Sequence, residues 1–408
     1  MNKERKEETQ EKTAMDNLLT MIMEAIEKGF IELHDVEIDV EEMEIKLQPV
    51  ISKTLKPVIK KVEKAIVELS KITFEEPKID FPGKIVEVKI GATKSEGGTR
   101  DRSIFIGGHT MPPYYYVYGY VSQNPPAFGG DIFDMRISLP RAVRQVFGDV
   151  LDNPIEWAKM WINEFKAEAI NVHLVSTDPN IKDTCPSDSA KLIEEILQQV
   201  KVPIVVGGCG HPTKDVEVFK KVSDVAEGER IVLNSLNLDM KIEDICKHIA
   251  KKDTVVINFS PMDLDKAREI NRKVYDWIPK SRIILDLNIG GIGYGTEYGF
   301  TAMERARLAA LLGDEELQHP FNVGASNAWG AREAWITMDP YWGPREIRGP
   351  LWEVLTCTIC LLAGADYFMI LHPTTLKTLK ELRENMFLQI KSITKDIIDW
   401  VSQKLPVI

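Results

Sequence analysis

From residue 131 onward, short apolar segments alternate with longer helical segments, and this alternation limits the possible folds more than any other feature. Eight segments have the length and composition of buried strands: residues 132–137, 170–175, 203–206, 231–233, 254–259, 283–287, 321–323 and 366–371. Helical spacing fills the intervals between them, although Pro340, Pro344 and Pro350 interrupt the stretch 332–363. Parallel strands need crossovers of this kind, and eight such units are typical of a barrel.

The sequence therefore predicts an α/β protein with a TIM (β/α)8 barrel over residues 131–408. An open, doubly wound sheet is the alternative. It is less favoured because the strand count is eight and no Gly-x-Gly-x-x-Gly follows the first strand.

Two further regions precede the predicted barrel. Residues 84–130 contain an alternating segment at 86–90 and an apolar one at 104–106, which indicate a β-hairpin with a wide loop. Residues 1–83 form an acidic N-terminal extension with helical spacing at 16–28 and 57–72. We expect these helices to pack on their own domain, and a docking arm for a larger assembly is the second interpretation.

Composition excludes several classes of protein. The chain has 408 residues, 44% of them apolar, so it can bury a large core. The net charge of −11 opposes nucleic-acid binding. We see no membrane-length apolar run and no signal peptide, so we expect a cytoplasmic protein without membrane contact.

Five scattered cysteines fit a reducing compartment better than a disulfide framework. Cys357 and Cys360 have the spacing of metal ligands, but they lie in the apolar stretch 355–362 and no second close pair exists. We expect buried core thiols here and no iron-sulfur cluster held by this chain alone.

Polar and glycine residues follow nearly every predicted strand. Because ligands bind at the carboxyl ends of barrel strands, we take these positions as the candidate cofactor-binding set. Its members are Asp178, Gly207, Gly208, Asn234, Asn258, Asp286, Asn288, Gly290, Gly291, Asn327 and His372. When each is taken singly, the favoured alternative for Asp178 and His372 is a role in local turns or helix caps, and for the nearby His211 it is to satisfy loop carbonyls.

The stretch 283–295 carries the strongest pattern of this kind, an apolar strand with Asp286 and Asn288 followed by four close glycines. Such glycines let a ligand approach the main chain. Turning the chain into the next helix is an equally good explanation for this stretch alone.

The carboxyl ends of the predicted strands carry few ionisable groups. Asp178, His211, Asp286 and His372 are the obvious titratable candidates, whereas general acid-base chemistry needs such groups within reach of each other. No Ser-His-Asp signature, His-Glu-x-x-His or Walker-type loop is present. We therefore assign no catalytic or metal-binding residue, and expect the rim to hydrogen-bond a polar heterocycle or a large cofactor.

Six short segments together carry a family resemblance: residues 104–108 (IFIGG), 153–158 (NPIEWA), 176–180 (STDPN), 207–210 (GGCG), 233–237 (LNSLN) and 286–291 (DLNIGG). The chain from about residue 84 onward resembles the small, or delta, subunit of corrinoid iron-sulfur proteins. In archaea that family belongs to the acetyl-CoA decarbonylase/synthase complex. Each segment is weak alone, and the combination is specific.

The resemblance implies a barrel that pairs with a larger gamma subunit. That partner would carry the iron-sulfur cluster and share a corrinoid with this chain. The pair would move a methyl group between a methyl-tetrahydropterin and the nickel site of acetyl-CoA synthase, in a complex that also contains CO dehydrogenase subunits. In this interpretation the barrel acts as scaffold and corrinoid cover.

Two other functions stay open. The fold that the resemblance implies is similar to that of pterin-dependent methyltransferases, so the barrel itself could bind the pterin and act as a corrinoid methyltransferase. An aldolase-type barrel that binds phosphate at residues 290–295 ranks last, because no strand end carries a lysine suited to a Schiff base.

Overall fold

The computed structural model describes residues 79–113, 123–288 and 290–387, together with Thr20, Met21, Glu24, Ala25 and Lys28. The chain divides into two compact units, residues 1–78 and 79–408, and every element named below belongs to the second. The expected helix at 57–72 lies outside the described residues. In the expected helix at 16–28, the described residues 20, 21, 24 and 25 are helical.

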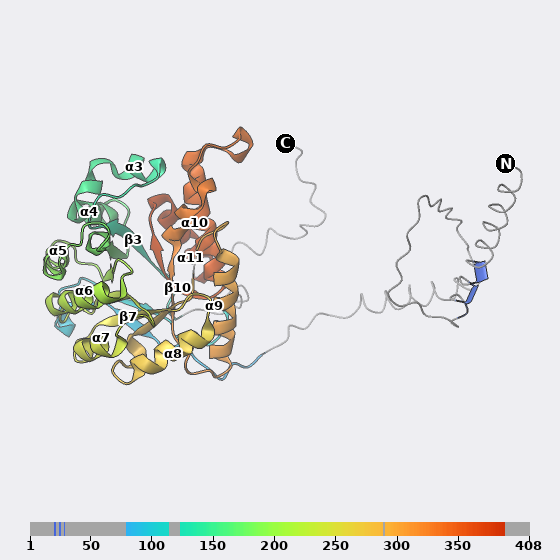
Figure 1. The fold of residues 1–408 in the computed structure, drawn as a ribbon, viewed down its shortest axis with the longest axis horizontal. Coiled ribbons are helices and arrows are strands. Elements are labelled where there is room, and N and C mark those ends of the chain that lie inside the picture. Colours follow the sequence, from blue (N-terminus) through green and yellow to red (C-terminus); the bar gives the residue numbers. More distant parts are fainter. Residues whose placement is uncertain are drawn as a thin grey trace, which may run out of the picture. The chain divides into compact units, whose positions relative to one another are not determined.

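Eight parallel strands close into a barrel with the order β10-β3-β4-β5-β6-β7-β8-β9, which confirms the predicted fold class (Figure 1). The strands are β3 (Ala127–Phe133), β4 (Ala169–His173), β5 (Ile204–Gly207), β6 (Val232–Leu236), β7 (Val255–Phe259), β8 (Ile283–Asp286), β9 (Phe321–Gly324) and β10 (Ala365–Ile370). All are short and largely buried, as strands covered on both faces must be.

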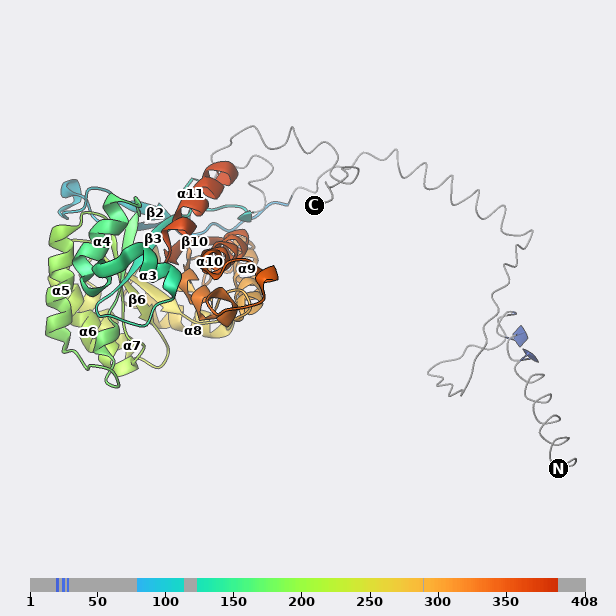
Figure 2. The same ribbon diagram turned by 90° about the horizontal axis from the view of Figure 1, so that it is seen from above.

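Helices surround the barrel in chain order (Figure 2). They are α3 (Arg141–Phe147), α4 (Pro154–Asn163), α5 (Pro186–Gln199), α6 (Pro212–Val225), α7 (Ile242–Ile249), α8 (Leu264–Tyr275), α9 (Thr296–Leu311), α10 (Arg345–Leu362) and α11 (Pro373–Phe387). The sequence explains where α4 and α8 begin, since Asn153 and Asp263 accept hydrogen bonds from N–H groups in the first turns of these helices. None of the helices in the described ranges is both long and apolar enough to cross a membrane.

The first barrel strand begins at Ala127, five residues before the predicted start at 132, so that prediction was wrong. The error arose because Gly129 and Gly130 resemble a turn. Both glycines instead allow close packing inside a strand. A Cβ on Gly129 would lie 2.2 Å from the Tyr367 hydroxyl, and one on Gly130 would lie 2.3 Å from the Trp161 ring.

The predicted hairpin is present and belongs to the barrel core. Strands β1 (Val88–Ile90) and β2 (Ile104–Ile106) pair antiparallel. Their buried side chains form one apolar cluster with inward residues at the amino ends of the barrel strands, among them Ala127, Ala169, Val232 and Val255. The hairpin therefore plugs the amino end of the barrel, leaving the carboxyl end as the place for ligands.

A buried carboxylate joins the two strands that complete the barrel. Asp366 on β10 is 1% exposed and accepts hydrogen bonds from Arg307 of α9 (2.7 Å), His109 after the hairpin (2.5 Å) and the backbone N–H of Phe321 on β9 (2.8 Å). Burial acts to raise the pKa of Asp366, but Arg307 and His109 outweigh it and the pKa lies below its ordinary value. Asp366 is therefore ionised in the folded protein.

If the hairpin is part of the core, truncating its inward side chains must destabilise the whole barrel. Ile106 is fully buried, so Ile106→Ala should lower the free energy of unfolding by about 2–5 kcal/mol. Phe105 precedes it on the same strand but faces outward and is 42% exposed, so Phe105→Ala should cost much less. Urea unfolding followed by far-UV circular dichroism compares the two. Equal small losses would show that the hairpin is not part of the core.

Candidate functional site

The carboxyl half of the barrel interior is polar, in contrast to the apolar half above the hairpin. Alternate residues of each strand face inward, and those nearest the carboxyl ends carry the polar groups. The set consists of Asp131 and Phe133 on β3, Asn171 and His173 on β4, Gly207 on β5, Asn234 on β6, Asp286 on β8, Asn322 on β9 and Tyr367 on β10. We call these nine residues the mouth set.

Three members of the mouth set form a buried hydrogen-bonded chain across β3, β4 and β10. Tyr367 donates from its hydroxyl to Oδ1 of Asn171 (2.7 Å), and Nδ2 of Asn171 donates to Oδ1 of Asp131 (2.8 Å). All three side chains are at most 1% exposed. A buried polar chain of this kind fixes the position of each member, so it holds Asp131 below the opening.

His173 lies above that chain and is partly exposed. Its ring stacks on Phe133 with centroids 5.0 Å apart, and its Nε2 lies 3.3 Å from Oδ2 of Asp131. The two atoms are not aligned for a hydrogen bond, and neither has another partner among the described residues. On β5, a Cβ at Gly207 would come within 3.1 Å of the His173 ring, so glycine leaves space beside it.

On the opposite side of the barrel, Asp286 and Asn322 form a buried pair. Nδ2 of Asn322 donates to Oδ2 of Asp286 (2.6 Å), and the backbone N–H of Asn288 donates to Oδ1 (3.0 Å). Burial raises the pKa of Asp286 to about 7, although both hydrogen bonds act in the other direction. Oδ1 of Asn322 has no partner within the described ranges.

The mouth set can therefore bind a polar ligand without strong acid-base chemistry of its own. Nε2 of His173, Oδ2 of Asp131 and Oδ1 of Asn322 are buried polar atoms that no described residue satisfies. Buried polar groups are normally hydrogen-bonded, so atoms of this kind indicate a ligand or ordered water.

Three of the predicted residues, Gly207, Asn234 and Asp286, lie in the mouth set. Asn234 is half-buried, and its amide nitrogen lies 3.8 Å from the sulfur of Met369. These three positions keep the candidate role that the sequence assigned to them.

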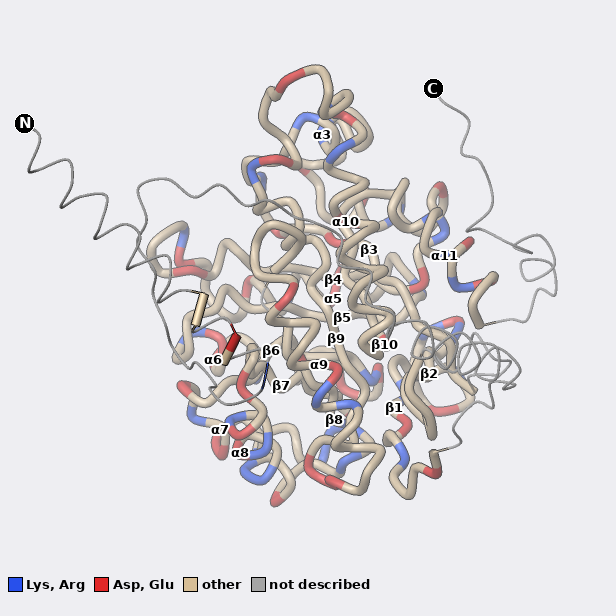
Figure 3. The backbone as a smooth tube through the Cα atoms, turned by 90° about the vertical axis from the view of Figure 1, so that its right-hand side faces the viewer, with Lys and Arg blue, Asp and Glu red and all other residues tan. Residues whose placement is uncertain are grey.

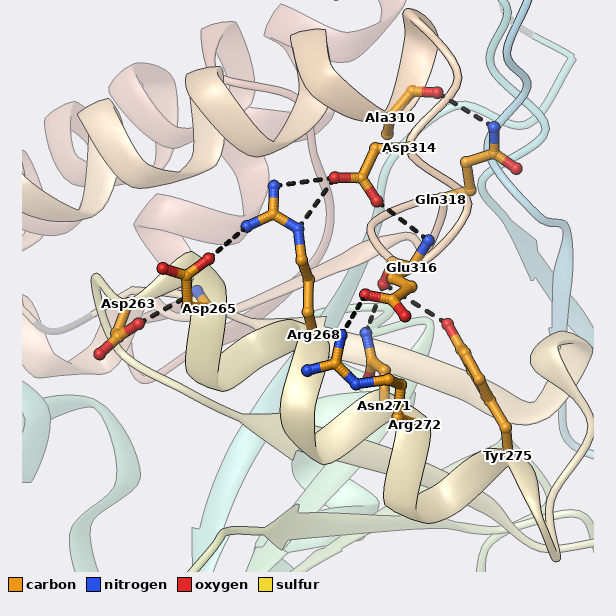
Figure 4. Close-up of polar contacts among 10 residues, drawn as sticks. All are labelled: Asp263, Asp265, Arg268, Asn271, Arg272, Tyr275, Ala310, Asp314, Glu316 and Gln318. Atoms are coloured by element: carbon orange, nitrogen blue, oxygen red, sulfur yellow. Dashed lines mark hydrogen bonds and ion pairs between the residues drawn. The ribbon is translucent and has the colours of Figure 1, made fainter.

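Asn258 and Gly208 face away from the mouth. Nδ2 of Asn258 donates to Asn271 of α8 (2.8 Å), and Asn271 in turn donates to the Glu316 carbonyl (2.7 Å), within the polar network that binds α8 to the loop before β9 (Figure 4). A Cβ on Gly208 would lie 2.4 Å from the carboxyl of Asp215, which accepts the N–H groups of the same loop. Their prediction as mouth residues was wrong because a one-residue step along a strand reverses the face.

Gly290 and Gly291, at the start of the loop that follows β8, are buried against protein, whereas Gly293 is exposed. A Cβ on Gly290 would lie 2.0 Å from the Tyr294 carbonyl oxygen, and one on Gly291 would lie 2.3 Å from Ala328. Asn288 is 2% exposed and points towards Gly299 of α9. Close packing of the chain therefore accounts for Gly290 and Gly291, and their role in cofactor binding stays a prediction.

The other predicted residues serve local turns or lie at the surface. Oδ1 of Asp178 accepts from the backbone N–H of Asn180 (2.7 Å), and Nδ1 of His372 accepts from that of Thr374 (3.2 Å). Burial lowers the pKa of His372 to about 4. Asn327 is exposed and its amide lies close to Gly324. The alternative role in turns is thus the one that Asp178 and His372 have.

Sequence reasoning missed Asp131, Asn171, His173, Asn322 and Tyr367. A period-two pattern was available, since Asn171 and His173 lie two residues apart on a strand whose position was predicted well. The misplaced start of β3 hid Asp131. Tyr367 and Asn322 gave no signal of their own because each stands inside an apolar strand.

Cys357 and Cys360 are fully buried on α10, as predicted for core thiols. Burial raises the pKa of Cys360 to about 12 and also holds the pKa of Cys357 well above its usual range. Across the described part of the chain, no three His, Cys, Asp or Glu side chains gather in a way that could hold a metal ion.

Large exposed side chains lie on the segments that follow β8 and β9, at the carboxyl end of the barrel. Tyr294 and Tyr298, in the loop after β8 and the first turn of α9, are 59% and 61% exposed. A Cβ on Gly330, in the loop after β9, would lie 3.5 Å from the Tyr294 ring, so the two loops adjoin. The same region also exposes Trp335, Tyr341, Trp342 and Ile347. We call these six residues the aromatic rim.

Comparison with known proteins gives consistent results. Residues 87–378 match the family model described as CO dehydrogenase/acetyl-CoA synthase delta subunit. The chain is 42% identical over 329 residues to acetyl-CoA decarbonylase/synthase complex subunit delta 1 of Methanosarcina thermophila, which covers 79% of this chain and 75% of that protein. It is 41% identical over 378 residues to subunit delta of Methanocaldococcus jannaschii, covering 90% and 92%.

Among solved structures, the barrel is similar to dihydropteroate synthases. The enzyme from Xanthomonas albilineans in complex with 7,8-dihydropteroate superimposes with a TM-score of 0.45 at 14% identity, covering 64% of this chain and 94% of that one. The Coxiella burnetii dihydropteroate synthase gives the same values.

The raised pKa of Asp286 makes stability depend on pH. An aspartate in an unfolded chain titrates near pH 3.9. Between about pH 4 and about pH 7 the folded protein keeps a proton that the unfolded chain has lost, so stability falls as pH rises, by at most about 1.4 kcal/mol per pH unit. Asp286→Asn retains an oxygen for Asn322 but cannot titrate. We expect its urea midpoint to change less between about pH 5 and about pH 8 than that of the unaltered protein.

Glu353 and Asp215 are also buried acids with raised pKa values, and since both proteins contain them they provide a common background. An Asp286→Asn variant with an unchanged pH dependence would show that Asp286 is not protonated in the folded state.

Proposed function

The chain belongs to the family of CO dehydrogenase/acetyl-CoA synthase delta subunits, and on this premise we propose that it is the barrel subunit that pairs with the gamma subunit and covers a corrinoid during methyl transfer. As a delta subunit of the acetyl-CoA decarbonylase/synthase complex, it has other subunits of that complex as partners. The gamma subunit, the CO dehydrogenase subunits and the acetyl-CoA synthase subunit are the partners we propose.

The aromatic rim is the observation that carries the proposal. Aromatic residues are enriched at the centres of protein interfaces, and a group of them exposed together marks a binding surface on a soluble protein. Tyr341, on the segment that joins β9 to α10, is 96% exposed, and Ile347, in the first turn of α10, is 61% exposed. This surface stands at the carboxyl end of the barrel, where a partner would close the mouth.

The mouth set fits a corrinoid in its chemistry. A corrin ring carries amide side chains, which pair well with neutral amides and with unsatisfied donors and acceptors. Asn234, His173 and Asn322 offer such groups, and the partly exposed Phe133 and Phe259 add apolar surface. When bound, a corrinoid supplies a cobalt that accepts and releases methyl groups.

The residues of this chain would then bind the cofactor and exclude water. No acid-base pair is needed for that role. Burial raises the pKa of Asp286 to about 7 and that of Glu353 to about 8, so neither carboxyl is fully ionised near neutral pH. Neutral walls would avoid binding water strongly beside the cofactor. We propose that the iron-sulfur cluster resides on the gamma subunit.

A second function is favoured by the Asp286 and Asn322 pair. A carboxyl and an amide fixed side by side in the barrel present acceptors to the N–H groups of a pyrimidine ring, as a pterin has. On that alternative the barrel binds the methyl-tetrahydropterin and is itself a corrinoid methyltransferase. Saturable binding of the pterin to this chain without its partner distinguishes the alternative from the cover.

The pairing surface can be tested with two variants of helix α9. Tyr298 in its first turn and Leu312 at its end are both 61% exposed, but only Tyr298 belongs to the aromatic rim. We expect Tyr298→Ser to weaken binding of the gamma subunit roughly tenfold or more, as loss of an interface aromatic often does. Leu312→Ser is the matched control and should bind normally.

Affinity is measured by surface plasmon resonance under anoxic conditions with one subunit immobilised. Methyl transfer by the reconstituted pair is the second measurement. Suppose that Tyr298→Ser pairs normally and supports full methyl transfer, while Leu312→Ser loses affinity for the gamma subunit. The partner would then bind at the other end of the barrel, which would contradict the proposal that the barrel covers the corrinoid.

A further inference from the structure

A second site lies beside the mouth, in a cavity of about 540 Å³ formed by the loops that follow β9 and β3. These strands flank β10 in the barrel, so the two loops meet above it. Three arginines line this cavity: Arg141 and Arg144 from α3, and Arg345 from the first turn of α10. Its volume is within the range of small-molecule sites.

The concentration of positive charge is unusual for this chain, whose net charge is −11. Basic segments are visible at α3, next to α10, in Figure 3. Among the residues that the structure describes, the acidic side chain that pairs with these arginines is that of Glu346. Its carboxylate lies 3.8 Å from Arg141 and 3.4 Å from Arg345. Two guanidinium groups thus share one carboxylate, both at more than the usual length of a charge-assisted hydrogen bond.

The guanidinium of Arg144 makes no hydrogen bond or ion pair with any described residue. It is exposed at the edge of the cavity, as is Arg141. Each guanidinium offers five donors in a planar fork, which suits the oxygens of a phosphate group. Most donors of this cluster therefore remain available for a ligand.

Two other features of the cavity agree with a phosphate-bearing ligand. Helix α10 begins after Pro344, which gives no side-chain cap, so the positive end of an 18-residue helix lies at the cavity beside Arg345. In β/α barrels the loop after the seventh strand often contributes to a phosphate site, and β9, whose loop lines this cavity, is the seventh strand here.

Aromatic surfaces complete the lining. Trp335 is 44% exposed and Trp329 lies mostly beneath the surface. An exposed indole beside an anion site can stack on a flat group attached to the phosphate. The cavity thus combines charge for a phosphate with a surface for a ring.

We propose that this cavity binds a phosphate group, either free or as the ester of a larger ligand. The inference stands on the arginines and the cavity alone, and does not depend on the function proposed for the mouth. Glu346 acts as a resident competitor, because its carboxylate occupies part of the same donor set.

The test is equilibrium dialysis of the full chain against ³²P-labelled inorganic phosphate at low ionic strength. We expect one saturable site per chain. Combining Arg144→Gln with Arg345→Gln should weaken phosphate binding roughly tenfold or more, as loss of charged hydrogen bonds does. Glu346→Gln should tighten it, since the competing carboxylate is gone. Arg305→Gln, at an exposed arginine of α9 away from the cavity, is the control and should leave binding unchanged.

Competition identifies the form of the ligand. Displacement by adenosine monophosphate at lower concentration than by unlabelled phosphate, lost in Trp335→Ala, indicates a phosphate ester, and the reverse order indicates free phosphate. The proposal is overturned if phosphate does not saturate, if Arg305→Gln loses binding as much as the double variant does, or if citrate displaces the label better than either phosphate compound. It is equally overturned if the double variant binds phosphate normally but loses affinity for the gamma subunit, because the cavity would then bind an acidic protein segment.

Discussion

The closure of the barrel rests on the buried carboxylate of Asp366. It accepts hydrogen bonds from α9, from the chain after the hairpin and from β9, so one side chain joins the last two strands to the plug at the amino end. The strand register shifts beside it, between Ala365 and Tyr367. Removing one partner of such a buried ionic group typically costs about 3–5 kcal/mol, because the other charge stays buried.

The junction of β9 and β10 also determines where the candidate site lies. Beyond the shift, Tyr367 aligns with Asn322, so both turn into the barrel at the same level. Tyr367 then reaches Asn171 and Asp131 on one side, while Asn322 holds Asp286 on the other. The apolar hairpin below and the polar layer above divide the interior, and a ligand can enter only from the carboxyl end. The aromatic rim and the arginine-lined cavity stand beside that opening, so partner, cofactor and anion would meet on one face.

Much of the fold could be predicted from the sequence, because strands covered on both faces leave short apolar runs separated by helical spacing. Six of the eight predicted strands lie within two residues of their true bounds at both ends, and β6 and β3 are the exceptions. The bounds of β3 were predicted wrongly because Gly129 and Gly130 serve close packing, which the sequence does not distinguish from a turn.

The candidate site was less predictable than the fold. Asn258 and Asp286 both stand at strand ends, yet one faces α8 and the other the mouth, and only the register decides which. The position of the hairpin at the amino end of the barrel could not be predicted either. Its sequence indicates that its two strands pair, but not which surface they pack against.

The central claim, a corrinoid site shared between this barrel and the gamma subunit, is tested most directly by visible absorption spectra recorded under anoxic conditions after incubation with corrinoid and removal of the unbound cofactor. We expect this chain alone to stay colourless and the pair to show the corrinoid bands. Asn234→Ala and Asn322→Ala in the pair should alter those bands or their change on methylation. A chain that retains corrinoid without its partner, or a pair whose spectrum and methyl transfer ignore both substitutions, would contradict it.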